Sequence, residues 1–167
     1  TRSNYQGRLF AEDALHGLEM IDLSRQLFDV IVMNPPFGEP TTGSRAYLEH
    51  SLKRSKGNIL THFVERTSNL LVSGGRLGAL VSRSCFFIPS FANFRRTVLS
   101  DELKVECFAD LGAGVLDAMV EAAAISWEKC SNTDVQAHFL RLLSSEDKPG
   151  DLKDCIKDVC SGKNNEK

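Results

Sequence analysis

The stretch FDVIVMNPPFGEP, residues 28–40, decides the fold class. Its apolar run from Val30 to Met33 is rich in β-branched residues, which predicts a strand covered on both faces at the centre of a parallel sheet. The run stops at Asn34, followed by two prolines, an aromatic ring and a glycine. In open α/β sheets, ligands bind beyond the carboxyl ends of the strands. This polar end therefore predicts a ligand site.

The residues after the strand supply the parts of a rigid binding corner. Pro35 and Pro36 fix φ and lack N–H groups, so the backbone is stiff and the Pro35 carbonyl has a defined direction. Asn34 adds a carbonyl acceptor, Phe37 a flat face, and Gly38 a turn away from both. Two acceptors and a ring suit a planar base with an exocyclic NH₂, whose nitrogen could attack an electrophilic carbon without a side-chain nucleophile. A plain Pro-Pro turn is the alternative interpretation.

The rest of the chain alternates between strand and helix patterns, which predicts an α/β layered fold. The expected strands span 7–11, 28–33, 76–82, 104–111 and 135–143, and the expected helices span 59–73, 91–100 and 151–160, with a short helix or turn over 14–27. Residues 38–58 are expected to form a long loop, and 119–128 fit either a helix or a strand. The polar tail after Ser161 is expected to be disordered.

Composition limits the class of protein. The chain has 167 residues, 42% hydrophobic and 25% charged, which is an ordinary balance for about one globular domain. A formal net charge of −2 argues against nucleic-acid binding by bulk electrostatics, so any polyanion site is local. Five cysteines without a C-x-x-C indicate a reducing cytosol, and no stretch approaches the roughly 20 apolar residues that cross a bilayer. The four histidines lack metal-site spacing, so no metal is expected.

The motif resembles a known family. FDVIVMNPPFG is similar to the catalytic motif of amino-methyltransferases that use S-adenosylmethionine (SAM), most closely the N6-adenine DNA methyltransferases of restriction-modification and phage-defence systems. The segments ILTHFVERTSNLLVSGG, RLGALVS, FRRTVL and CFADLGAGVLDAMVEAAAISW follow in the family's order, so the resemblance covers roughly residues 7–128. It implies a Rossmann-like methyltransferase sheet, mostly parallel with an antiparallel edge and with helices on both faces. It also implies SAM as cofactor, DNA as substrate, restriction-modification or defence subunits as partners, and a cytoplasmic location without a membrane.

The resemblance also implies roles for individual residues. Asn34 and the Pro35 carbonyl would accept hydrogen bonds from the adenine N6 amine, Pro36 would complete the motif, and Phe37 would stack on the base. The base must be flipped, because an amine paired inside a duplex is out of reach. Asp13, at the end of the expected strand 7–11, matches the position that contacts the adenine ring of SAM. A surface aspartate that closes a strand is the alternative.

Two departures from the family's pattern limit these expectations. The family's glycine-rich SAM loop precedes the catalytic motif, and only 33 residues precede Asn34 here. We therefore expect residues 1–145 to be a C-terminal part of a catalytic domain and 146–167 to be a helix and tail; alone, the chain should neither bind SAM well nor turn over. Leu116 occupies the position of a second base-packing aromatic, which weakens the expected base clamp. Phe86 or Phe87 could compensate, although core burial is expected for both.

Several alternatives remain at this point. Gly112-x-Gly114 after a strand resembles the start of a SAM or dinucleotide loop, but a third glycine is missing, so an ordinary loop is favoured. Basic side chains flank the motif and would either contact phosphates beside Gly38 or be solvated: Arg45, Lys53, Arg54 and Lys56. Other substrates of the same amine site are RNA adenine or guanine and protein glutamine. A non-catalytic interaction domain with the same fold is the alternative of a different class.

Overall fold

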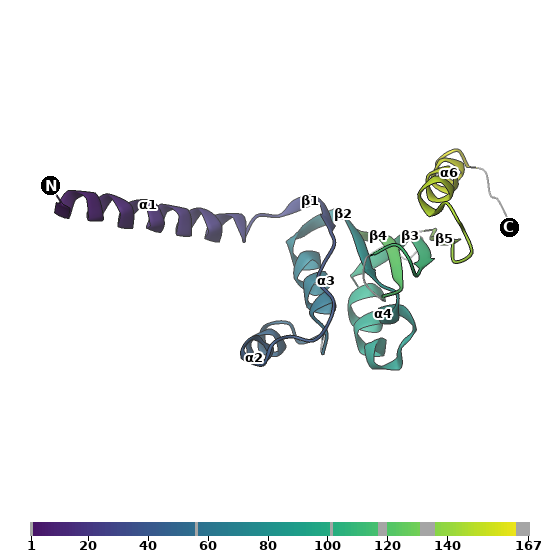
Figure 1. Cartoon of the computed structure of the whole chain (residues 1–167), viewed down its shortest axis with the longest axis horizontal. Coiled ribbons are helices and arrows are strands. Elements are labelled where there is room, and N and C mark those ends of the chain that lie inside the picture. The colour runs from purple at the N-terminus through teal and green to yellow at the C-terminus, as the bar shows by residue number, and fades with distance from the viewer. Residues whose placement is uncertain (1, 56, 101, 117–119, 131–135, 163–167) are drawn as a thin grey trace.

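The computed structural model describes residues 2–55, 57–100, 102–116, 120–130 and 136–162 (Figure 1). The elements are α1 (Arg2–Leu23), β1 (Phe28–Met33), α2 (Thr42–Ser51), α3 (Ile59–Leu70), β2 (Leu71–Ser82), α4 (Ser84–Phe87), η1 (Pro89–Phe91), α5 (Ala92–Phe94), η2 (Arg95–Ser100), β3 (Leu103–Gly112), β4 (Ala122–Lys129), β5 (His138–Arg141) and α6 (Lys148–Cys160). The strand order is β1-β2-β4-β3-β5. β1 is parallel to β2 and β5 to β3, while β4 is antiparallel to both of its neighbours.

This topology confirms the predicted fold class. Of the strands in the described part of the chain, only β4 runs against the others, so the sheet is mostly parallel. The antiparallel strand lies inside the sheet, between β2 and β3, whereas the prediction put it at an edge. α3 and the helical segment 84–100 cover one face, and α6 lies over the other (Figure 1). Helices on both faces are therefore confirmed.

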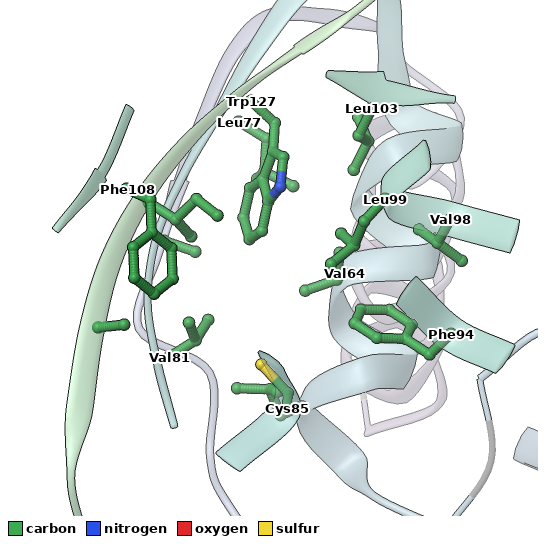
Figure 2. Close-up of a cluster of buried hydrophobic side chains, with 14 of the residues drawn as sticks. Val64, Leu77, Val81, Cys85, Phe94, Val98, Leu99, Leu103, Phe108 and Trp127 are labelled. Carbon is green, nitrogen blue, oxygen red and sulfur yellow. The ribbon is translucent and has the colours of Figure 1, made fainter. Parts of the chain in front are cut away.

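The main core lies between the sheet and the helices on the α3 side. β2 alternates, with Leu77 and Val81 fully buried toward this side. Figure 2 shows Trp127 of β4 beside Leu77, facing side chains from α3 and the segment 84–100. Trp127 is only 1% exposed, as is Val64 of α3. Burying side chains of this size contributes about 1.5–3 kcal/mol each, so this face holds the fold together.

The environment of β1 differs from the prediction. β1 forms the edge of the sheet, and its Val30 and Val32 side chains are 61% and 81% exposed. The prediction of a central strand covered on both faces was wrong. The apolar run correctly identified a strand, but no described element covers these valines or pairs with the outer edge of β1.

Two further expectations near the N-terminus were wrong. Residues 7–11 are not a strand, because they lie within the helix α1, which extends away from the sheet (Figure 1). Its large apolar side chains are exposed, Phe10 by 73% and Met20 by 68%. The stretch 38–58 is not entirely loop, since α2 occupies Thr42–Ser51. Helix α2 buries none of its residues, so it needs no apolar face. Its sequence therefore lacks the apolar periodicity that predicts a helix.

The remaining elements follow the sequence pattern. The expected helices around 59–73, 91–100 and 151–160 and the strands around 76–82, 104–111 and 135–143 are confirmed, and the ambiguous stretch 119–128 contains strand β4. The expected disorder falls largely on residues 163–167, outside the described residues. The division at residue 145 stays a prediction. Within the described chain, no helix combines the length and apolar character needed to cross a membrane.

Candidate active site

The carboxyl ends of β1, β2 and β3 meet at one edge of the sheet, because these three strands run in the same direction. Asn34 follows β1 directly and is exposed. Its side chain makes no hydrogen bond to the residues that the structure describes, so its carbonyl oxygen is free to accept one. It borders a cavity of about 510 Å³ together with Gly78 of β2 and Leu152 of α6.

The loop after Asn34 is anchored to helix α3. Pro35 is buried, and Phe37 packs in part against the core. The carbonyl of Gly38 accepts a hydrogen bond from the Ile59 N–H at 2.8 Å, at the first residue of α3. Asn58 caps the same helix by accepting from the Leu60 N–H at 3.0 Å. The corner is therefore fixed at both ends, by β1 and by α3.

The backbone conformation at position 38 requires a glycine. Its φ is +112°, a region that L side chains rarely adopt, and no neighbouring atom would touch an added Cβ. We expect Gly38→Ala to destabilise the fold by about 1–3 kcal/mol through backbone strain alone. Gly43→Ala, in helix α2, is the matched control, because it meets no neighbour and lacks a positive φ; alanine there should be neutral or stabilising. Equal urea midpoints for the two variants would contradict the expected backbone strain at residue 38.

Phe37 borders a second cavity of about 440 Å³ beside the loop. Gly38 and Asn58 line one side, and Ser84 and Glu121 contribute from other segments. Asn34 is not among its lining residues, so the motif lies between two cavities. The second cavity lies at the carboxyl end of β2, where the sequence predicted a ligand site, whereas the first extends over the face of the sheet across β2, β4 and β3. The second cavity thus provides open space beside Phe37.

Leu116 lies in the loop that follows β3 and is partly buried. It belongs to neither of these two cavities. Gly112 and Gly114 have φ of +65° and +80°, and residues 113–116 form no helix. A Cβ on Gly112 would lie 2.8 Å from Leu143 Cδ2, so this glycine permits close packing. The interpretation of Gly112-x-Gly114 as an ordinary loop agrees with this geometry.

Arg83 joins the ends of three strands and was missed by the sequence analysis. Its Nε donates to Asp110 of β3 at 2.7 Å, and its guanidinium donates to Glu121, just before β4, at 2.9 Å. The hydrogen bond to Asp110 raises the pKa of Arg83 further above its usual value. The guanidinium also lies 4.6 Å from the centre of the Phe87 ring. Arg83 thereby fixes the walls of the second cavity; a single arginine after a strand gives no sequence signal for this.

The two phenylalanines behave differently. Phe86 packs edge-on against Phe108, with ring centres 4.9 Å apart, and lies against the core as expected. Phe87 is 57% exposed, so the expectation of burial was wrong for it. Neither ring lines the cavity beside Phe37.

The basic residues near the motif divide into exposed and structural ones. Arg45 forms an exposed ion pair with Glu39 at 2.7 Å, and Lys53 is exposed. Lys56 lies outside the described residues. Arg54 pairs with two carboxylates, so it has a structural role. Phosphate contacts by Arg45 and Lys53 stay predictions.

A buried polar network surrounds Arg54. Glu65, on α3, accepts hydrogen bonds from the Ser55 N–H at 2.8 Å, the Ser55 hydroxyl at 2.5 Å and Arg54 Nε at 3.2 Å. Arg54 also donates to Glu102, and this bond raises the pKa of Arg54. His62 Nδ1 lies 3.0 Å from Ser55 Oγ, and burial lowers the pKa of His62. Sequence spacing could not reveal this network, because 37 residues separate Glu65 from Glu102.

Asp13 lies in α1 and is exposed. Its predicted setting at the end of a strand was wrong, because α1 is helical and extends away from the sheet (Figure 1). Contact of Asp13 with a cofactor stays a prediction. Within the described ranges, no cluster of histidine, cysteine or acidic side chains could hold a metal ion.

Comparison with known structures identifies the same fold. A class I S-adenosylmethionine-dependent methyltransferase from Listeria monocytogenes matches with a TM-score of 0.61 and 18% identity over 80% of this chain and 42% of its own. A modification subunit of a type I restriction enzyme from Vibrio vulnificus matches with a TM-score of 0.65 and 14% identity over 85% and 33%. The type ISP restriction-modification enzyme LlaGI, in complex with a DNA substrate mimic, has a TM-score of 0.57 and 15% identity over 74% and 13%.

The chain thus spans less than half the length of each of these proteins. No curated protein sequence matches it significantly. The family model described as the Eco57I restriction-modification methylase matches residues 4–113, which include the Asn-Pro-Pro-Phe corner and the strands β1 and β2. The chain belongs to the Eco57I restriction-modification methylase family.

Proposed function

We propose that this chain forms the catalytic half of a SAM-dependent methyltransferase that acts on the N6 amine of adenine in DNA. The observation that carries the proposal is the exposed Asn34 at the carboxyl end of β1, whose side-chain oxygen has no partner among the residues that the structure describes, together with an open cavity beside Phe37. Membership of a restriction-modification methylase family supports the reaction class. DNA as substrate is supported by the DNA-bound enzyme of the same fold.

The corner acts on the amine through hydrogen bonds. The Asn34 side-chain oxygen and the Pro35 carbonyl accept the two N–H groups of the adenine amine, which draws the nitrogen out of conjugation with its ring. The lone pair of the nitrogen would then be available to the methyl group of SAM: the nitrogen–carbon bond would form as the carbon–sulfur bond breaks, S-adenosylhomocysteine would leave, and the nitrogen would lose one proton to solvent. Positioning and electrostatic stabilisation account for the catalysis, without a covalent enzyme intermediate.

SAM supplies an electrophilic methyl group when bound. The residues present fit the side of such a site that would face the methyl group, because Asn34, the proposed acceptor for the target amine, borders the 510 Å³ cavity. The exposed edge of β1 adjoins this cavity and lacks a pairing strand among the described elements. Residues that bind the rest of the cofactor would therefore lie beyond this edge, in the remainder of the intact enzyme.

A substrate panel tests the proposal. The intact methyltransferase that contains this chain should transfer radiolabelled methyl groups from SAM to DNA, and not to RNA or protein substrates of matched concentration. Labelling of RNA or of protein glutamine instead would reassign the substrate of the same corner. Absence of SAM binding by calorimetry, together with absence of labelling on every substrate, would show a non-catalytic domain.

A further inference from the structure

The groove between α2 and α3 contains a buried acceptor that nothing in the proposed reaction uses. It is the largest of the cavities described here, at about 660 Å³, and its lining comes mainly from α2 and α3. Tyr47, Leu48 and Leu52 line it from α2 and its C-terminal end, and His62 and Phe63 line it from α3. This volume lies within the range of sites for nucleotide-sized molecules.

The hydrogen bonds of His62 define its tautomer. The single hydroxyl proton of Ser55 goes to Glu65 at 2.5 Å, so Ser55 Oγ must accept from His62 Nδ1–H at 3.0 Å. Burial lowers the pKa of His62, so the ring is neutral at pH 7 and Nε2 carries a lone pair. His62 is 2% exposed, and Nε2 has no hydrogen-bond partner among the described residues. Buried polar atoms normally have a partner, so this atom points to a missing donor.

The other residues that line the groove indicate which kind of molecule would supply the missing N–H donor. Tyr47 and Phe63 are 71% and 42% exposed and offer flat faces to a planar ring. Arg66 gives one N–H to the Ser24 carbonyl at 2.8 Å and forms no ion pair within the described part of the chain, so its charge is available to an anion. A nucleotide base such as guanine or thymine combines these features, since it is a planar ring with an N–H donor linked to an anionic phosphate. Aromatic stacking together with an arginine is the usual means of binding unpaired bases.

We infer that the α2/α3 groove binds a nucleotide. Its base stacks against Tyr47 or Phe63 and donates an N–H to His62 Nε2, and its phosphate contacts Arg66. The groove shares no lining residue with the two cavities beside the Asn-Pro-Pro-Phe corner. The inference therefore goes beyond the proposed methyl transfer and does not depend on it.

Nitrogen NMR of the histidine rings tests this directly on the 167-residue chain. Addition of dGMP or of a single-stranded (dT)₁₀ oligonucleotide should shift the His62 Nε2 signal in the direction of hydrogen-bond acceptance. Arg66→Gln and Tyr47→Ala should each weaken the measured affinity by about fivefold or more, since one stacked base or one phosphate contact is worth that much. Arg96→Gln is the matched control: it removes an equal charge from η2, where the Arg96 side chain hydrogen-bonds to Asn93 and to no other residue in the described ranges.

Comparison of dGMP with the (dT)₁₀ oligonucleotide distinguishes a free nucleotide from one residue of a strand. Shifts with both would support a general nucleotide site, and shifts with the oligonucleotide alone would support a site for one residue of a strand. An unchanged Nε2 signal with both ligands at millimolar concentration would overturn the inference. Binding that Arg66→Gln and Arg96→Gln weaken equally would overturn it as well, because it would reflect charge alone. Neither result would affect the assignment of Asn34, which the activity of its variants tests.

Discussion

Asn34→Ala is expected to lower methyl transfer by the intact enzyme about 100-fold or more, with folding unchanged. The substitution removes one of the two acceptors that the reaction needs on the target amine, and loss of one such preorganised group typically costs a factor of 10²–10³. Because Asn34 is exposed and makes no side-chain hydrogen bond to the described residues, its removal leaves the packing intact. Single-turnover methylation at saturating DNA measures the effect on the chemical step.

Asn93→Ala provides the matched control. Asn93 is an exposed asparagine in α5, where its side chain contacts the Arg54 carbonyl at 3.4 Å and the Arg96 guanidinium at 3.2 Å. The Asn93 variant should retain full activity. Equal activity of the Asn34 variant and the wild type would remove Asn34 from the mechanism, whereas a lower melting temperature for Asn34→Ala would show that it has a structural role.

Glu65→Ala is expected to lower the free energy of unfolding by about 3 kcal/mol or more. The carboxylate of Glu65 is 5% exposed and accepts three hydrogen bonds from Ser55 and Arg54. Its removal leaves the Ser55 N–H and a partly buried guanidinium without that acceptor, and loss of one partner from a buried pair costs about 3–5 kcal/mol. Because Arg54 is 29% exposed, water offsets part of this cost.

The exposed ion pair between Glu39 and Arg45 gives the comparison. Glu39 and Arg45 are 73% and 47% exposed, so Glu39→Ala should change stability by less than about 1 kcal/mol. Urea unfolding followed by circular dichroism measures both variants. Similar midpoints for the two would mean that the network around Glu65 does not organise the segment between α2 and α3.

The central elements of the fold could be predicted because their patterns are local. A β-branched run marked β1, the short apolar segment RLGALVS after Gly74-Gly75 marked β2, and the helical spacing of apolar residues marked α3. β4 was ambiguous because AAAISW suits a helix as well as a strand; pairing with β2 and β3 on both sides decides in favour of the strand. Such long-range pairing is invisible in a local window.

The two errors at the N-terminal side of the sheet share one physical origin. The sequence predicted cover on both faces of β1 and a strand at 7–11, and both expectations depend on neighbouring strands and helices that the described residues do not supply. Without such partners, Val32 is exposed, and residues 7–11 adopt the locally hydrogen-bonded helix α1. The network around Glu65 was missed for a related reason, since it depends on how Arg54 and Ser55 fold back onto Glu65 and on Glu102, which lies 48 positions from Arg54.

The identity of the methylated atom tests the central claim most directly. Mass spectrometry of nucleosides from DNA treated with the intact enzyme and isotopically labelled SAM should show label on the N6 atom of adenine, and Asn34→Ala should abolish it. Label at a ring carbon such as cytosine C5 would contradict an amine site at the Asn34 corner, and so would N6 labelling that persists undiminished in the variant.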